Sequence, residues 1–343
     1  MRRPVKESLE EAEETAEDLM VAAQLSAALE VSGWPKPGNV HRTADHPDTR
    51  FEHFLAGATA MGPTLRRTTL LGMKAGFGMI EVSEVEVGRL VRQAVSSVKQ
   101  WHRGGNTHLG VCLMFVPLVA AAGKTYAEHG KTPPSDIAKN VDIVMRSTTP
   151  EDAAEVYKAI LTVSTVQELG EVKGEQAPDL YDPKAKKRLL EEGISLFDVM
   201  ETASGWDTIA GELTAGMRVS FKVGYPMLID TFHQTQDINT ATVHTFLTLL
   251  SKFPDTFIAR KIGLKETSDI KKAVSIGRRK TGWISERAGH ILELGGLTSE
   301  AGRVALSEFD RTLQSAQGEL NPGTTADLTA ASLLIAILDG LRF

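Results

Sequence analysis

The stretch LGVCLMFVPLVAAAG at residues 109–123 is the longest apolar run of the chain and holds no charged residue. It contains Pro117 and falls short of the roughly 20 residues that a helix needs to cross a bilayer. The run therefore predicts a helix buried in a protein core. It also holds Cys112, the single cysteine, so neither a disulfide framework nor a thiolate metal cluster can form within the chain.

Apolar residues recur every three or four positions on both sides of this run, the period of an amphipathic helix. No alternating strand segments and no strand–helix alternation accompany them, so the sequence predicts an all-α fold. The pattern predicts helices at residues 7–31, 51–72, 84–101, 107–122, 152–163, 196–203, 208–217, 240–250, 268–277, 299–316 and 325–341.

The domain organisation follows from length and from the distribution of Pro and Gly. At roughly 100 to 200 residues per domain, 343 residues allow one large domain or two ordinary ones. Pro and Gly cluster at residues 32–47, 123–135 and 170–183, which predicts three long loops. Polar, Gly-rich motifs lie on both sides of the last loop. We therefore expect a single helical domain over residues 1–343, with a sub-lobe break near residues 165–183.

Charge and composition restrict the partners. The net charge of −6 argues against a nucleic-acid partner, which requires a basic face. The basic first residues are followed by an acidic segment at residues 7–18 rather than an apolar one, so we expect no export signal, no membrane partner and a location in the cytoplasm. The sequence leaves a homo-oligomer open.

A glycine turn leads into the apolar helix at GGNTHLG, residues 104–110. Asn106 or Thr107 can cap the helix, and free backbone N–H groups at such a helix start bind anions. Gly105 would let a phosphate approach the backbone, and His108 could donate a hydrogen bond or a proton to it. The structural alternative is a capped helix with a half-buried histidine.

A second polar segment, WPKPGNVHR at residues 34–42, is held between prolines and carries Lys36 and Arg42. It is followed by Asp45 and Asp48. Cationic side chains beside carboxylates can form a triphosphate clamp next to a magnesium site, because Mg²⁺ is usually held by one or two carboxylates and phosphate oxygens. The alternative is a solvated turn in which Asp48 or Thr49 caps the next helix.

Two further motifs lie in the second half of the chain. NPGTTAD at residues 321–327 opens the final predicted helix, with Thr324 as its cap and Asp327 three residues on, close to a capping box. The functional alternative is that the free backbone N–H groups at this helix start bind a phosphate. In WDTIAGE at residues 206–212, the two carboxylates are about 140° apart on a helix, so only one can face a shared site. No zinc-hydrolase, serine-hydrolase or dinucleotide-binding motif is present.

These segments together resemble the triphosphoribosyl-dephospho-CoA synthase family. Residues 35–42 and 45–48 are similar to that family's Pro-Lys-Pro-Gly-Leu-Val-Asp-Arg and His-x-Asp motifs. Residues 106–110 are similar to Asn-Thr-His-Lys-Gly, and residues 322–328 to Pro-Gly-Gly-Ser-Ala-Asp-Leu. The matches keep their order over most of the chain, which makes the resemblance more specific than any one motif. The matching segments are residues 35–42, 45–48, 106–110, 207–212 and 322–328.

The resemblance implies an all-α enzyme that moves a 5-triphosphoribosyl group from ATP to the 2′-hydroxyl of dephospho-CoA with Mg²⁺ as cofactor, releasing adenine. Such a transfer passes through an oxocarbenium-like ribose C1 and requires a base and cations on the phosphates. We assign phosphate or substrate binding to Lys36, Gly38, Arg42, Gly105, Asn106, Thr107, Thr324 and Thr325. We assign catalysis to Asp45, Asp48, His108 and Asp207, and metal binding to Asp45, Asp48 and Asp327.

The chain departs from the family pattern at Asn39, His41, Leu109 and the pair Thr324-Thr325. Leu109 replaces a lysine, which removes a phosphate-facing charge. The leading alternative is therefore phosphoribosyl transfer from phosphoribosyl pyrophosphate in the synthesis of a tetrahydromethanopterin-type cofactor. A hydrolase of a ribosyl bond and a non-catalytic nucleotide-binding protein remain as further alternatives. For the transferase, we expect Lys36→Ala to abolish turnover with little loss of folding.

Overall fold

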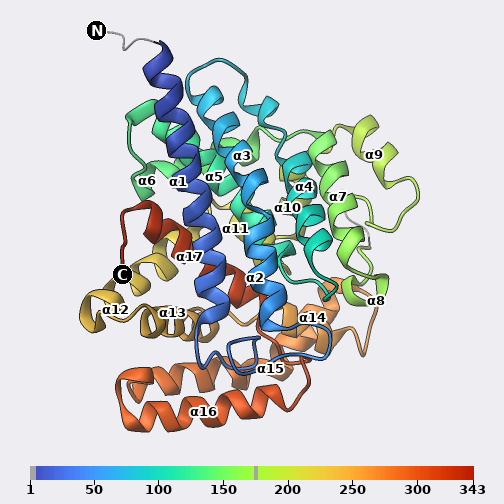
Figure 1. The fold of residues 1–343 in the computed structure, drawn as a ribbon. Coiled ribbons are helices and arrows are strands. Elements are labelled where there is room, and N and C mark those ends of the chain that lie inside the picture. The colour runs from blue at the N-terminus through green and yellow to red at the C-terminus, as the bar shows by residue number, and fades with distance from the viewer. Residues whose placement is uncertain (1–4, 174–176) are drawn as a thin grey trace.

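The long apolar run forms helix α5 (Leu109–His129) in the computed structural model, which describes residues 5–173 and 177–343 (Figure 1). Residues 111–125 of α5 are all buried. The helix extends past its predicted end, and Lys124 and Glu128 form an ion pair on the added turns. Of the helices in the described ranges, α5 alone is long and apolar enough to cross a membrane, yet 89% of its apolar window is buried inside the protein.

Helix α5 packs closely against α3 (Gly62–Gly76). The approach depends on glycine, because a Cβ added to Gly72 would lie 2.1 Å from the carbonyl oxygen of Ala120 and one on Gly123 would lie 2.3 Å from that of Thr69. Backbones this close leave no room for side chains between them. The other elements of the first half are α1 (Val5–Ser32), α2 (Phe51–Ala60), η1 (Val82–Val85), α4 (Val87–Trp101), α6 (Pro134–Arg146), α7 (Pro150–Val163) and α8 (Val166–Leu169).

The second half of the chain completes the bundle. Figure 1 shows α15 and α16 side by side at one end of the molecule, while α17 runs into its interior. The elements are α9 (Ala185–Glu192), α10 (Leu196–Ala203), α11 (Thr208–Thr214), η2 (Ser220–Gly224), α12 (Tyr225–Thr235), α13 (Ile238–Lys252), α14 (Thr256–Gly263), α15 (Ile270–Glu293), η3 (Gly296–Thr298), α16 (Glu300–Gln314) and α17 (Gly323–Leu338).

The prediction of an all-α fold is confirmed, since no β-strand forms within residues 5–173 and 177–343. Its largest hydrophobic cluster joins residues on both sides of the predicted break at 165–183, such as Leu118 and Leu334. The predicted helix at 51–72 is wrong as a single element: it divides at Met61, where Pro63 begins a new helix. The pattern also missed α6, α9, α12 and α14.

Candidate active site

A central cavity of about 230 Å³ lies where the starts of α5, α11, α14 and α17 meet the last turn of α1. Helix starts carry partial positive charge, so their convergence favours anionic groups. The cavity brings together the segments around His108, Asp207 and Asp327, and Asn39 from the segment at residues 34–42. Its polar lining consists of Glu30, Asn39, Asn106, Thr107, His108, Ser164, Asp207, Arg260, Asn321, Thr324 and Asp327.

Asp327 on the first turns of α17 is the most strongly perturbed carboxyl group of the cavity. Burial raises its pKa well above the ordinary value, and the carboxylates of Glu30, Asp255 and Asp207 raise it further, while the backbone N–H of Val111 has the opposite effect. The side chain reaches α5 because Gly110 has no Cβ, which would lie 1.9 Å from Asp327 Oδ2. Perturbed groups of this kind concentrate at functional sites.

This close contact makes Gly110 a test of the position of Asp327. We expect Gly110→Ala to lower turnover by about 100-fold, because the added methyl group must displace the carboxylate and small misplacements at a reacting centre are costly. The measurement is the steady-state rate of the folded variant. Gly282→Ala is the matched control, since a Cβ there meets no heavy atom within 4 Å. Equal rates for the two variants would contradict the assignment.

The side chain of Lys36 is fully buried and does not line the central cavity. Its ammonium group donates to the backbone oxygen of Glu30 at 2.9 Å and forms an ion pair with the Glu30 carboxylate. Burial lowers the pKa of Lys36 and raises that of Glu30, and the attraction within the pair opposes both shifts. Lys36 thus holds the carboxylate of Glu30 at the cavity wall, and its own charge is already paired.

Asp207 and Arg260 form the opposite pair of charged groups. Asp207 precedes α11 and accepts the backbone N–H of Ala210 at 3.1 Å. Arg260 Nη1 lies 3.9 Å from Asp207 Oδ2, and its guanidinium lies 5.3 Å from the ring of Phe257. The Nε atom of Arg260 is buried without a hydrogen-bond partner. Arg260 is the one Lys or Arg side chain that lines the central cavity within the described ranges, so it is the cation available to a phosphate there.

His108 lies at the start of α5 with its ring buried against Phe54. Its Nδ1 shares a hydrogen bond of 2.8 Å with the hydroxyl of Thr107, and Asn106 accepts the N–H of Leu109 at 3.1 Å, as a capping side chain does. Burial, with a smaller effect from His102, lowers the pKa of His108 to about 3. The ring is therefore neutral at physiological pH and is too weak a base to accept a proton in catalysis.

The pKa of His108 makes the stability of the fold depend on pH. In the unfolded chain the ring binds a proton near pH 6.5, whereas in the folded protein it does so only near pH 3. The unfolded state binds more protons in this window, so the free energy of unfolding falls as pH falls through it, by up to about 1.4 kcal/mol per pH unit.

We expect His108→Gln to remove this contribution. The measurement is the free energy of unfolding in urea between pH 4 and pH 7, compared between the variant and wild type. His46 and His102 also have lowered pKa values and are present in both proteins, so the difference between the two slopes reports on His108. Identical slopes in the two proteins would show that His108 is not a buried neutral group.

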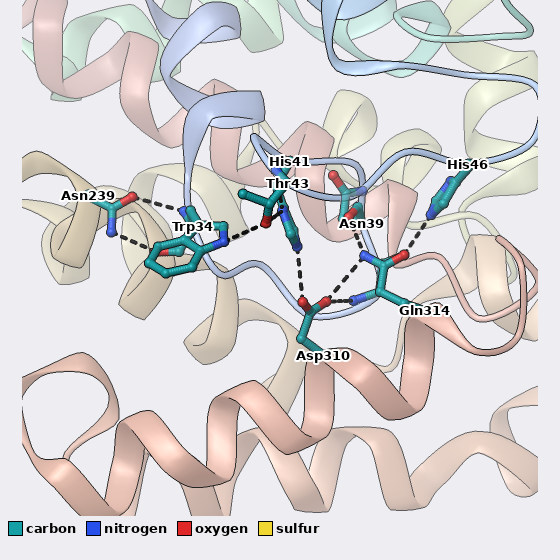
Figure 2. Close-up of polar contacts among 9 residues, drawn as sticks. Trp34, Asn39, His41, Thr43, His46, Asn239, Asp310 and Gln314 are labelled. Carbon is teal, nitrogen blue, oxygen red and sulfur yellow. Dashed lines mark hydrogen bonds and ion pairs between the residues drawn. The ribbon is translucent and has the colours of Figure 1, made fainter.

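The segment at residues 34–50 is held by α16, and within it only Asn39 lines the central cavity (Figure 2). The N–H of Gly38 donates to Asp310 Oδ1 at 3.0 Å, and the ring of His41 lies 3.0 Å from Asp310 Oδ2. Gly38 has a φ of 71°, and a Cβ there would lie 2.6 Å from that of Leu313. Gly38 is therefore required by a tight turn against α16.

The remaining acids and the arginine of this segment also lie outside the lining of the central cavity. Arg42 donates to the backbone oxygen of Ser32 at 2.6 Å, and Asp45 accepts the N–H of Phe51 at 2.9 Å at the start of α2. Asp48 is exposed beside Gly105, whose N–H donates to its backbone oxygen at 2.9 Å. The structure thus separates Asp45 and Asp48 from Asp207 and Asp327.

The predicted metal ligands Asp45, Asp48 and Asp327 do not come together as one protein-only ligand set. Across residues 5–173 and 177–343, no group of three or more His, Cys, Asp or Glu side chains is arranged to hold a metal ion. Asp327 lies at the central cavity, whereas the other two lie on the loop that precedes α2. A metal ion in the cavity would need ligands from a substrate as well.

The prediction that Thr324 caps the final helix is wrong, because α17 already begins at Gly323. Thr324 lines the cavity and lies 3.3 Å from the hydroxyl of Thr256. Thr325 instead points to Asp255, which accepts both its N–H and its hydroxyl at 2.8 Å. Burial raises the pKa of Asp255, although these hydrogen bonds favour its charged form. Thr325 thus joins α17 to α14 and is not free for a substrate.

Sequence reasoning missed Glu30 and Arg260. Both lie within helices, in the last turn of α1 and in α14, and belong to none of the polar motifs, so no local signal separates them from surface charges. Trp34, Trp101 and Trp206 lie beside the polar motifs in sequence, but none of them lines the central cavity. The aromatic rings that do so are the half-buried Phe54 and Phe257.

Comparison with known proteins gives the family and the fold. The family model described as ATP:dephospho-CoA triphosphoribosyl transferase (CitG) matches residues 16–342. The fold is similar to the crystal structure of a candidate triphosphoribosyl-dephospho-CoA synthase from Archaeoglobus fulgidus, with 24% identity and a TM-score of 0.56 over 84% of this chain and 100% of that one. No curated protein sequence matches this chain. Because the family match spans nearly the whole sequence, the chain belongs to the ATP:dephospho-CoA triphosphoribosyl transferase family and is a transferase.

Proposed function

We propose that this transferase moves a 5-triphosphoribosyl group from ATP to the 2′-hydroxyl of dephospho-CoA in the central cavity, and does so in the cytoplasm. In this reaction the bond between the ribose C1 and adenine breaks, adenine leaves with the bonding electrons, and the acceptor oxygen bonds to C1. The hydroxyl proton must pass to a base. The observation that carries the proposal is the group of carboxylates at Glu30, Asp207 and Asp327, which line one cavity.

The carboxylates suit the charge that develops during transfer. As adenine departs, C1 becomes cationic, and preorganised negative charge around it lowers the barrier. The mutual repulsion that raises the pKa of Asp327 is relieved when positive charge develops or enters nearby. Asp207 and Asp327 are also the proton acceptors that we propose for the hydroxyl, since His108 is too weak a base.

The phosphates and the base of ATP are matched by other groups of the cavity. Arg260 offers a guanidinium whose Nε has no partner in the protein, and the start of α17 adds the hydroxyl of Thr324. Arg260 lies on the same cavity as Leu109, so it can supply the charge that the motif lysine provides elsewhere in the family. Phe54 and Phe257 offer ring faces for adenine.

We also propose Mg²⁺ as the cofactor, held by Asp207 and Asp327 together with phosphate oxygens of ATP. The donor set fits, because Mg²⁺ is commonly bound by one or two carboxylates plus substrate phosphates. Bound there, the ion would neutralise charge on the triphosphate. Arg260, next to Asp207, would hold the same phosphates from the other side.

A second candidate donor, phosphoribosyl pyrophosphate, is favoured by one observation. Asn39 and Leu109 both line the cavity, so two departures from the family motif alter the surface that a ligand would touch. Asn39 donates to Asn321 at 2.8 Å, but its own Oδ1 is buried without a hydrogen-bond partner. That atom can accept a hydrogen bond from a ligand. The leucine of the typical family motif could not accept one.

The test is a matrix of the two donors against dephospho-CoA, a pterin-type acceptor and no acceptor, in the presence of Mg²⁺, read by mass spectrometry. We expect adenine and the triphosphoribosyl adduct of dephospho-CoA from ATP. Release of pyrophosphate with the pterin acceptor would assign the second donor. Donor cleavage without acceptor would indicate a hydrolase, and binding without turnover in any pairing would indicate a nucleotide-binding protein.

A further inference from the structure

A second cavity, which we call the side cavity, has a volume of about 320 Å³ and lies between the ends of α4 and α7 and the segment at residues 104–109. It shares Asn106, Thr107, His108 and Leu109 with the central cavity, and Ser164 on the other side. The segment before α5 is thus a wall with a cavity on each face. A two-substrate enzyme needs two binding sites that meet at one point, and this wall is such a point.

The two cavities differ in charge. The central cavity carries the carboxylates of Glu30, Asp207 and Asp327, whereas the described lining of the side cavity includes no Asp or Glu. Much of that lining is apolar, from Val95, Val98, Leu109, Leu161 and Val163. Lys99 is the one Lys or Arg of the described lining, and its ammonium group donates a hydrogen bond to the backbone oxygen of Thr162. An uncharged chain with apolar stretches can therefore enter the side cavity without losing solvation of a charge.

Cationic groups lie at the outer rim of the side cavity. Gly105 lines both this cavity and an open depression whose lining includes Arg50 and Arg103. Both arginines are exposed, and neither takes part in an ion pair with the described residues. Asp48 lines the same depression, with its carboxylate close to Gly105. Two guanidinium groups beside one carboxylate leave a net positive charge that suits a diphosphate.

We propose that the side cavity is the acceptor subsite, an inference that rests on the proposed function. Dephospho-CoA joins a long uncharged pantetheine arm to adenosine through a diphosphate. The arm lies in the side cavity, the diphosphate lies against Arg50 and Arg103, and the ribose passes the wall at residues 106–108, so that its hydroxyl reaches the donor C1 in the central cavity. Neither the family match nor the fold comparison assigns this cavity to a ligand.

Leu161→Trp tests the proposal, because it fills the side cavity from a side chain that is 44% exposed, which lets the variant fold. We expect the KM for dephospho-CoA to rise by at least about 10-fold while the KM for ATP is unchanged. Leu190→Trp on α9 is the matched control, since Leu190 is 40% exposed and lines neither cavity. Equal KM values for dephospho-CoA in the two variants would overturn the proposal.

A truncated acceptor separates the arm from the diphosphate. Adenosine 5′-diphosphate has the hydroxyl and the diphosphate but no arm, so Leu161→Trp should leave its KM unchanged, whereas Arg103→Ala should raise the KM of both acceptors. If Leu161→Trp affects both acceptors equally, the arm does not occupy this cavity.

If wild type forms no product, the proposed function fails, and calorimetric titration of dephospho-CoA then tests the subsite by itself. Leu161→Trp must weaken that binding by at least about 10-fold relative to Leu190→Trp. Unaltered binding, or no binding to wild type, would overturn the subsite as well.

Discussion

Asp327→Asn is expected to lower turnover by at least about 100-fold, because it removes negative charge from the point where the ribose C1 becomes cationic. The same change should raise the free energy of unfolding near neutral pH by about 1 kcal/mol, because a buried carboxylate repelled by its neighbours is replaced by a neutral group of similar size. Lower activity together with higher stability would show that Asp327 serves the reaction and destabilises the fold.

The raised pKa of Asp327 also sets the direction in which the free energy of unfolding changes with pH. The pKa of Asp327 is raised in the folded state, so the folded protein binds more protons than the unfolded chain above the ordinary value of 3.8. The free energy of unfolding of wild type should therefore fall as pH rises through this range. In the variant, the contribution of residue 327 to this fall should be absent.

Unfolding in urea at several pH values measures the effect. Mg²⁺ with ATP should raise the Tm of wild type more than that of the variant, because the variant lacks a proposed ligand. A variant that is active, or less stable at every pH, would contradict the role of Asp327.

Lys36→Ala is expected to destabilise the fold by about 3 to 5 kcal/mol, since it leaves the carboxylate of Glu30 buried without its partner. The sequence alone predicts a phosphate-binding lysine that can be removed with little loss of folding. The structure changes that expectation, because the ammonium group is fully enclosed and is paired with α1. The measurement is the midpoint of urea unfolding.

The double variant Glu30→Gln/Lys36→Met is the control, because it removes both charges together. It should recover most of the stability lost in Lys36→Ala, and it should remain poorly active because Glu30 also faces the cavity. A fully stable and active Lys36→Ala protein would show that the buried ion pair has no part in either property.

The sequence predicted the fold class because helical periodicity is a local property. It also predicted the family, since the order of five polar motifs is visible without coordinates. It could not predict that a helix would divide at Met61 or that α5 would continue to His129, because both depend on packing between helices.

The candidate site was predicted in part. Residues near His108, Asp207 and Asp327 do line one cavity, since each lies at the start of a helix that points toward it. The segment around Gly38 was predicted to carry cations for a phosphate, but Asp310 and Gln314 bind its backbone from α16, 272 and 275 residues away in sequence. Arg260 was missed because only the tertiary fold brings α14 beside Asp207.

The central claim is that the acidic central cavity transfers a triphosphoribosyl group. Its most direct test is the release of adenine from ATP by wild type and by folded Asp327→Asn, in Mg²⁺, with and without dephospho-CoA. The structure predicts adenine release that requires dephospho-CoA, gives the matching adduct and falls by at least about 100-fold in the variant. Adenine release that is unchanged in Asp327→Asn, or its absence from wild type with this acceptor, would contradict the claim.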